Sequence, residues 1–529
     1  MSLPLFNWRL AYFISIGLRF VFALSNSYIH PDEHFQSLEV MTSRILGFSA
    51  NIPWEFTSTP ARSLAPLYLI YGPIIYLIKF VGLQLSPLQI WYLIRLQNVV
   101  IGWIITDMCI YRILPTKPER MKAILFTLTS YITLVYQSHL FSNSIETYLL
   151  ILAVMIIDNI RYIDESKDPR VKVISQKKEL AWLGLVISLG IFNRITFPAF
   201  LLFPSWYLVK YLWKNKSSVI FLVSGFVSTS MACIVIDTIG YTGSETILSD
   251  PFSYKTYVIT PLNNLIYNSN YLNLAHHGIH PLYTHLFINI PQILGLSGII
   301  LVLYKLKNQY YLTVPFLSAA SGIVVLSCFP HQELRFLIPI VPLLCCCFDM
   351  SKFASQTPKK TTWINVLLYE WYAFNILMSI LMGIFHQGGV VPALDHLHTS
   401  STTNTFQVWW RTYSPPTWIL GDKDSSTQVI TLNDENFDAG YILDATKSTY
   451  IFDTMGSDHE KVEKLLEELL SINNQTILIT PTASFNVEFD NSTTPYKQLW
   501  HYNYHIDMDH LDFSNLDSLK PGLGIYQLL

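Results

Sequence analysis

The segment His30–Gln36 places two adjacent carboxylates and two imidazoles after the first apolar stretch of the chain. A carboxylate within reach of a hydroxyl group can remove its proton as a general base. Pro31 confines any helix to its C-terminal side, so Asp32 and Glu33 are expected near a helix N-terminus. The helix dipole also favours carboxylates at that position. Two interpretations follow: helix capping alone, or acid–base catalysis.

A second cluster of functional side chains occupies His331–Phe336, where another apolar stretch begins. His331 and Arg335 are four residues apart and share one face if the segment is helical. The guanidinium fork of an arginine matches the geometry of phosphate oxygens. The alternative interpretation is an interfacial anchor, because arginine side chains also extend toward the aqueous boundary at helix ends.

A third cluster, Phe192–Pro198, contains Arg194 deep within an apolar stretch. Charges inside a membrane are costly and generally face a cavity or a partner. The ends of a broken helix can also bind anions. Glu146 begins a different apolar stretch and is a candidate partner for such an arginine. Arg19, in the first apolar stretch, is a weaker functional candidate because its side chain can reach the interface.

The composition indicates that lipid is the solvent for much of the chain. Of 529 residues, 51% are hydrophobic and 13% are charged, and the mean hydropathy is +0.34. Soluble domains carry about 25% charged residues. The net charge of −3 gives no indication of nucleic-acid binding. The six cysteines all fall within apolar stretches, which favours buried small side chains over a disulfide framework.

Apolar segments of membrane-spanning length recur between residues 8 and 386. The segment 181–213 is too long for one span, and we expect Asn193 and Arg194 to divide it into two short helices. The segment 66–82 is expected to be re-entrant or interfacial, with a break at Gly72-Pro73.

The distribution of Lys and Arg orients these segments. Basic loops, including 112–122 and 161–178, are predicted to face the cytosol, and the loops 26–65 and 239–284, nearly free of Lys and Arg, to face the lumen. The result is about 11 crossings, with a cytosolic N-terminus and a lumenal C-terminus.

Residues 387–529 are polar and contain no predicted span, so we divide the chain into a membrane module, 1–386, and a lumenal domain, 387–529. Strand-like runs occur at Gln428–Thr431, Thr449–Phe452 and Thr476–Thr480. A helix with one apolar stripe is predicted between the last two runs, beginning with a capping box at Ser457–Glu460. These features predict a small α/β domain.

The motif His30-Pro31-Asp32-Glu33, followed much later by His-Gln-Glu-Leu-Arg-Phe at 331–336, resembles glycosyltransferase family 22. Trp409–Trp418 is more similar to the yeast members that add the fourth mannose of the GPI anchor. One departure is Gln332, where the family usually has lysine. The resemblance implies an endoplasmic-reticulum membrane protein of GT-C architecture: all-α and polytopic, with the small lumenal α/β domain appended.

The resemblance also implies the reaction: transfer of mannose from dolichyl-phosphate-mannose, in α-1,2 linkage, to a GPI precursor that bears three mannoses. Because the donor linkage is β, the displacement inverts the anomeric centre. Asp32 is the expected general base, with Glu33 as the alternative base or as a group that orients the acceptor. Arg335, His331 and Arg194 are expected to bind the donor phosphate. The remaining substrate-binding candidates are His30, His34, Gln36, Glu146, Glu333 and Trp410. No cofactor or metal ion is expected, since no nucleotide diphosphate leaves and no ligand spacing is present.

Three alternatives remain open from the sequence. Another family 22 activity, on the third GPI mannose or on the N-glycan precursor, would use the same motifs. A lipid transporter or scramblase could also contain many spans with buried charges, but paired broken helices in an inverted repeat are not seen. A non-catalytic scaffold subunit would not require Asp32 or Arg335.

Overall fold

The computed structural model describes residues 8–165, 176–270, 272–273, 278–305, 310–348, 358–400, 405–423, 426–433, 437, 440–489, 495–511 and 516–529. The chain divides into two compact units. Unit 1 comprises Met1–Phe20, Trp54–Ile70 and Gln97–Leu377, and unit 2 comprises Val21–Pro53, Tyr71–Leu96 and Met378–Leu529. Unit 2 thus contains the polar C-terminal region together with two segments from the first hundred residues.

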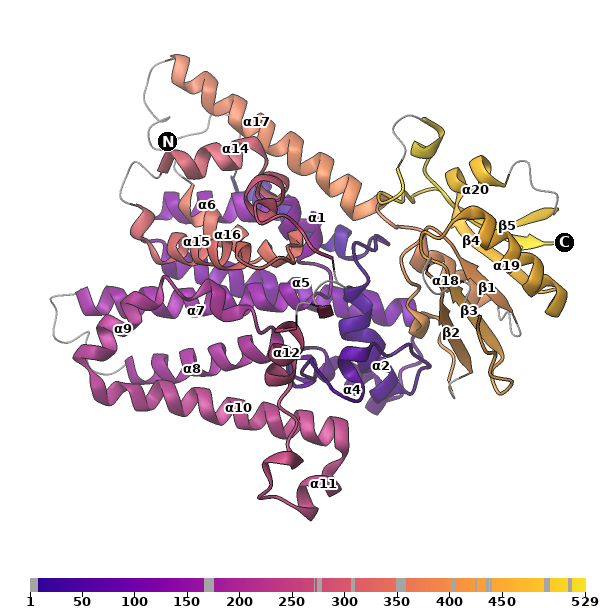
Figure 1. Cartoon of the computed structure of the whole chain (residues 1–529). Coiled ribbons are helices and arrows are strands. Elements are labelled where there is room, and N and C mark those ends of the chain that lie inside the picture. The colour runs from indigo at the N-terminus through magenta and orange to yellow at the C-terminus, as the bar shows by residue number, and fades with distance from the viewer. Residues whose placement is uncertain are drawn as a thin grey trace. The chain divides into compact units, whose positions relative to one another are not determined.

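Unit 1 is helical (Figure 1). Its helices are α3 (Ala65–Ile70), α6 (Lys117–Thr129), α7 (Ser142–Glu165), α8 (Gln176–Asn193), α9 (Ser205–Lys214), α10 (Val219–Thr242), α11 (Ser244–Ser249), α12 (Thr260–Asn268), α14 (Ile290–Lys305), α15 (Val314–Ser327) and α16 (Ile340–Cys347). Three further helices belong partly to each unit: α1 (Trp8–Ala23), α5 (Pro87–Ile113) and α17 (Pro358–Ile380).

Several described helices are long and apolar enough to cross a membrane. By length and composition these are Pro87–Ile113, Ser142–Glu165, Lys216–Thr242, His285–Leu303 and Trp363–Phe385. They support a multi-pass membrane protein. The prediction of about 11 crossings and the assignment of each loop to cytosol or lumen remain predictions. Part of the predicted cytosolic loop 161–178 lies outside the described residues.

Both predicted helix breaks are present. Helix α8 ends at Asn193, and a 3₁₀ turn, Phe197–Phe200, precedes α9. Arg194 therefore lies at the end of a helix. A charged side chain in an apolar stretch is expected to face a cavity or a partner, and the helix end allows this. Helix α3 ends at Ile70, and α4 begins at Gly72, with Pro73 in its first turn.

Helices α7, α8 and α10 lie side by side in unit 1 (Figure 1). Two glycines bring the backbones of α8 and α10 into direct contact. A Cβ atom at Gly184 would lie 2.1 Å from the carbonyl oxygen of Leu222, and one at Gly225 would lie 2.0 Å from that of Ala181. Small residues allow this close approach of helices inside membranes.

Unit 2 combines short helices with a sheet. Its helices include α2 (Glu39–Leu46), α4 (Gly72–Val81), α18 (Val390–Thr399), α19 (His459–Ile472) and α20 (Thr482–Glu488). Its strands are β1 (Phe406–Trp409), β2 (Thr427–Thr431), β3 (Thr449–Asp453), β4 (Thr476–Pro481), β5 (Tyr496–Tyr502) and β6 (Leu523–Leu528).

The sheet has the order β2-β3-β1-β4-β6-β5. The first four strands are parallel, and β6 and β5 continue the sheet in antiparallel fashion. The apolar stripe of α19, including Val462, Leu465, Leu466 and Leu469, packs against side chains from β1, β3, β4 and β6. The predicted α/β fold, three of its strands and the helix α19 are therefore confirmed.

The predicted capping box at Ser457 is wrong. Helix α19 has Asp458 as its N-cap, without a capping bond from that side chain. The Ser457 hydroxyl instead donates to the carbonyl oxygen of Leu432. Because the carbonyl lies on a neighbouring loop, this hydrogen bond ties the helix start to the sheet rather than to its own first turn.

Candidate functional site

The two adjacent carboxylates of the first motif have different environments. A helical turn begins at Asp32, just after Pro31, and continues into the π-helical segment His34–Leu38. The Asp32 side chain is 19% exposed, and its carboxylate lies 3.5 Å from Nδ1 of His30. The Glu33 side chain is fully buried. Asp32 is therefore the carboxylate of the pair that a substrate could reach.

Glu33 forms a buried ion pair with Arg95. Nε and Nη2 of Arg95 donate to the two carboxylate oxygens of Glu33, each at 2.7 Å. The same guanidinium donates to the carbonyl oxygens of Ser25 and Ser27. It also lies over the Trp91 ring, 3.9 Å from the centroid. A bidentate, charge-assisted pair of this kind holds Glu33 ionised and immobile, which suits a structural role better than proton transfer.

The other polar candidates in unit 2 are largely buried. His34 accepts a hydrogen bond at Nδ1 from Nε1 of Trp418, at 3.1 Å, and its ring contacts Tyr28 and Trp91. Gln36 is 8% exposed. Trp410 is fully buried and donates to the carbonyl oxygen of Ser457. Substrate contacts by His34, Gln36 and Trp410 stay predictions.

A further buried carboxylate, Glu39, follows the first motif in the chain and was not among the predicted site residues. Glu39 accepts hydrogen bonds from the backbone N–H of Asn51 at 2.7 Å and from the Thr417 hydroxyl at 2.6 Å. Burial raises the pKa of Glu39 to about 7, although these hydrogen bonds oppose the shift. This carboxylate connects the first loop to the Trp409–Trp418 motif, and its signal in the sequence was a third acid shortly after Asp32 and Glu33, at the start of α2.

In unit 1, the second motif is organised around Glu333. One Glu333 oxygen lies 2.9 Å from Nε2 of His331, and the other pairs with Nε of Arg335. Burial alone would lower the pKa of His331, but the hydrogen bond and charge of Glu333 outweigh it and raise the pKa. Arg335 lies in a 3₁₀ turn, Leu334–Leu337, so the shared α-helical face expected for His331 and Arg335 does not form. Glu333 brings these two side chains together instead.

Arg194 joins this cluster through an aromatic ring. Its guanidinium lies 4.9 Å from the centroid of Phe336, and that of Arg335 lies 5.6 Å from the same centroid. Nε of Arg194 lies 3.2 Å from a carboxylate oxygen of Glu146, which confirms Glu146 as its predicted partner. Thr196 also donates to Glu146. The arrangement leaves two guanidinium groups around one ring, each oriented by its own carboxylate.

A third arginine contributes to the positive potential there. Arg62 repels the charge of Arg194, as does Arg335, and attracts that of Glu146. Arg62 itself pairs with Glu55 at 2.9 Å. Arg62 was not predicted as a functional residue because it lies in the loop 26–65, whose few basic residues indicated only its orientation. An isolated arginine in such a loop was the available signal.

Gln332 explains why this position can lack the positive charge that lysine would bring. Its amide oxygen accepts the backbone N–H of His285 at 2.8 Å, and its amide nitrogen donates to the carbonyl oxygens of Leu282, Ser327 and Phe329. Lysine has donors only and could not accept the His285 bond. Gln332 therefore stabilises the loop that contains His331 and Arg335 through these hydrogen bonds.

The candidates thus fall into two groups, one in each unit. Unit 1 brings together Glu146, Arg194, His331, Glu333 and Arg335. Unit 2 contains His30, Asp32, Glu33, His34, Gln36 and Trp410. Within unit 2, Asp32 lies beside His30, whereas Trp410 belongs to the core of the C-terminal sheet.

Comparison with known proteins identifies the type of enzyme. The chain is 56% identical to GPI mannosyltransferase 4 of Debaryomyces hansenii over 541 residues, covering 100% of both chains. It is 53% identical to that of Candida albicans and 36% identical to that of Saccharomyces cerevisiae, with 99% of each chain covered.

The fold is similar to that of ArnT from Cupriavidus metallidurans bound to undecaprenyl phosphate, with a TM-score of 0.52, 9% identity, and coverage of 98% of this chain and 97% of that one. This likeness supports a GT-C type of fold. A model of the Alg9-like mannosyltransferase family matches residues 10–420. The chain therefore belongs to the Alg9-like mannosyltransferase family.

Proposed function

We propose that this mannosyltransferase adds the fourth mannose to a GPI-anchor precursor, using dolichyl-phosphate-mannose as donor and forming an α-1,2 linkage to the third mannose. Full-length similarity to the enzymes named GPI mannosyltransferase 4 supports the acceptor. The observation that carries the mechanism is the contrast between Asp32, which is accessible, and Glu33, which Arg95 immobilises.

The proposed reaction is a single displacement at the anomeric carbon. The 2-hydroxyl oxygen of the acceptor mannose bonds to C1 of the donor mannose while the bond from C1 to the phosphate oxygen breaks. The hydroxyl proton passes to the carboxylate of Asp32, and dolichyl phosphate leaves with the bonding electron pair. One attack from the opposite face converts the β linkage of the donor into an α linkage. His30, beside Asp32, can orient the carboxylate and accept the proton in turn.

The leaving phosphate requires positive charge that is already in place. Arg335, Arg194 and His331 are the proposed binding groups, since Glu333 and Glu146 fix their positions and Phe336 separates the two guanidinium groups. Hydrogen bonding to Glu333 favours the charged form of His331. In this proposal Glu146 and Glu333 act on the donor indirectly, by holding the side chains that bind its phosphate. His34, Gln36 and Trp410 contribute to binding of the acceptor. No metal ion takes part in the proposed step.

We propose a location in the endoplasmic-reticulum membrane, with about 11 crossings and with the reaction and the C-terminal domain on the lumenal side. Helices long enough and apolar enough to cross a membrane, together with membership of the mannosyltransferase family, support the membrane part of this proposal.

The deciding experiment is transfer by purified protein in lipid nanodiscs. Dolichyl-phosphate-mannose is supplied with a trimannosyl GPI precursor, and products are resolved by mass and by α-1,2-mannosidase digestion. The expected product is a tetramannosyl precursor whose added mannose is removed on digestion. Transfer to a dimannosyl precursor or an N-glycan precursor instead would identify a different family activity. Donor-lipid translocation without any transfer would favour a transporter.

A further inference from the structure

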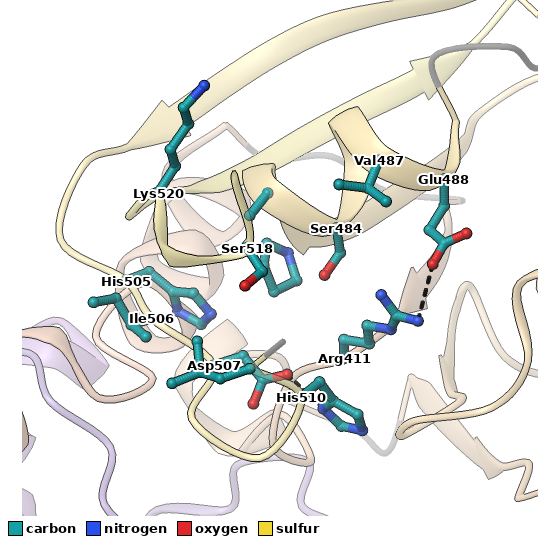
Figure 2. A pocket seen from close by; sticks show the side chains of 13 residues that line it. Arg411, Ser484, Val487, Glu488, His505, Ile506, Asp507, His510, Ser518 and Lys520 are labelled. Atoms are coloured by element: carbon teal, nitrogen blue, oxygen red, sulfur yellow. Dashed lines mark hydrogen bonds and ion pairs between the residues drawn. The ribbon is translucent and has the colours of Figure 1, made fainter. Parts of the chain in front are cut away.

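A cavity in the C-terminal part of unit 2 is lined by residues that the proposed reaction does not use (Figure 2). Its volume is about 360 Å³, within the range of about 300–1,000 Å³ typical of small-molecule sites. Its polar lining includes Arg411, Ser484, Glu488, Asp507 and His510. Figure 2 shows the side chains of Arg411, Ser484 and Asp507 converging on the same space.

The position of the cavity in the sheet is one that commonly binds ligands. Arg411 follows the carboxyl end of β1, and Pro481 ends the adjacent parallel strand β4. The chain leaves β1 toward β2 and β3 on one side and reaches β4 on the other side, so the strand order reverses at this point. In open α/β sheets, ligands bind outside the carboxyl ends of the strands at such a reversal.

Two buried hydrogen-bond donors in the lining have no acceptor among the described residues. His505 is fully buried, and its Nδ1 accepts the backbone N–H of Gly389 at 3.2 Å, so the ring proton resides on Nε2. No described group accepts from that Nε2, nor from Nε of Arg411. Burial lowers the pKa of His505 to about 3, which keeps the ring neutral. Buried donors without acceptors are rare in folded proteins because each costs free energy, which suggests that a ligand or water supplies the acceptors.

The same cavity offers acceptors as well as donors. Glu488 lies 3.2 Å from Nη2 of Arg411 and is 31% exposed, so part of its carboxylate remains accessible. Asp507 pairs with Nδ1 of His510 through Oδ2, and its Oδ1 accepts from the Gln387 amide and the Asp509 backbone N–H, so Glu488 is the more available acceptor. Ser484 adds a hydroxyl group that can both donate and accept. The charged side chains of the lining are paired: Arg411 with Glu488, His510 with Asp507, and Lys520 with Asp517. Such a lining favours a neutral ligand, and sugar hydroxyls can both accept from the N–H groups and donate to the carboxylates.

We propose that this cavity is a saccharide-binding site, in which Nε2 of His505 and Nε of Arg411 donate to sugar oxygens and Glu488 and Asp507 accept from sugar hydroxyls. The site gives the C-terminal domain a second contact with glycan, separate from the residues assigned to mannose transfer. The choice of mannose as the sugar rests on the proposed function, but the presence of the site does not.

The test measures binding of α-1,2-mannobiose to the full-length protein by saturation-transfer-difference NMR. Lipid nanodiscs are required, because maltoside detergents carry sugar headgroups. Ser484→Phe places a ring in the cavity and should weaken binding at least about tenfold. Asn486→Phe is the matched control, since Asn486 is exposed on the same helix, α20, and does not line the cavity. The control should bind as the unchanged protein does.

Glu488→Gln provides a second test that does not depend on how α20 tolerates a large ring. It keeps the size of a partly exposed side chain but removes the charged acceptor, and it should weaken mannobiose several-fold. Equal binding by all variants, no binding by the unchanged protein, or displacement of mannobiose by millimolar inorganic phosphate would overturn the proposal. Mannobiose binding by a protein that transfers no mannose would contradict the proposed function but support the saccharide site. Normal mannose transfer without mannobiose binding would support the proposed function but contradict the saccharide site.

Discussion

The two carboxylate oxygens of Glu33 and the guanidinium of Arg95 form parallel hydrogen bonds of 2.7 Å, with both side chains excluded from solvent. The two residues are 62 positions apart in the chain. Their pairing separates the functions of adjacent acids in the first motif: Glu33 holds the loop together, and Asp32 remains accessible.

Glu33→Gln should therefore fail chiefly through stability. Removing one partner leaves the charge of Arg95 buried, which costs about 3–5 kcal/mol. The thermal unfolding midpoint of purified protein should fall substantially, whereas Asp164→Asn, which breaks the more exposed pair with Lys214, should cost about 1 kcal/mol or less. The double variant Glu33→Met/Arg95→Met should recover part of the loss. An unchanged midpoint in Glu33→Gln would refute the structural role.

Asp32→Asn should fold normally and transfer very little mannose. The amide preserves the shape of the side chain and can cap a helix, but it cannot accept a proton. Loss of a general base reduces rate by about 10²–10⁴-fold. Rates are compared at equal amounts of folded protein, with Asp250→Asn, an exposed loop position, as the control. Wild-type turnover by Asp32→Asn would remove it as the base.

Arg335→Lys tests phosphate binding against membrane anchoring. Lysine retains the charge but replaces a planar fork with a point charge, and the loss of one charge-assisted hydrogen bond, about 1.5–3 kcal/mol, corresponds to about 10–100-fold in transfer rate. The exposed Arg112→Lys serves as the control. An interfacial anchor would tolerate lysine, so near-normal transfer by well-folded Arg335→Lys would support anchoring.

The protonation of Glu39 should make folding stability depend on pH. Its folded pKa of about 7 lies above the ordinary value of 4.5, so the folded state holds the proton more tightly than the unfolded state. Stability should therefore fall as pH rises from 4.5 to 7 and level off above 7. Thermal unfolding of Glu39→Gln should show a flatter profile across that window. Parallel profiles for the two proteins would exclude Glu39 as the source.

Glycosylation sites test the predicted orientation. Asn474 is exposed at the end of α19 and begins the sequon Asn474-Gln475-Thr476, so it should carry glycan. Asn491-Ser492-Thr493 is also predicted to be lumenal and lies outside the described residues. Asn215-Lys216-Ser217 should remain unmodified. A glycosidase-sensitive mass shift that maps to Asn215 would reverse the topology.

The sequence was most informative where one residue conflicts with its surroundings. Arg194 interrupts an apolar stretch that is too long for one span; the length and the interruption together predicted the helix break, and the buried charge made Glu146 a candidate partner. The strands β3 and β4 were predictable because buried strands form runs rich in apolar residues. Three strands were missed: β5 is largely exposed at the sheet edge, and β1 and β6 are buried but short.

Long-range pairings could not be derived in the same way. Nothing in the local sequence indicates that Arg95 meets Glu33 rather than another acid, because the contact depends on how α5 and the first loop pack within unit 2. The local pairing of Glu333 with both His331 and Arg335 was missed for a different reason. A helical spacing rule relates residues of one regular helix, and this segment forms a 3₁₀ turn.

The close contact of α8 and α10 has a consequence for how the protein is made. Gly184 and Gly225 each pack against the backbone of the opposite helix, so each helix has a packing surface that only the other helix covers. At about 5–20 residues per second, α10 leaves the ribosome within seconds of α8, and the pair can assemble as a hairpin during synthesis. A larger residue at either glycine would block that early pairing. Such a variant should therefore be degraded more and reach a lower amount in the cell, while the molecules that do fold keep their normal transfer rate.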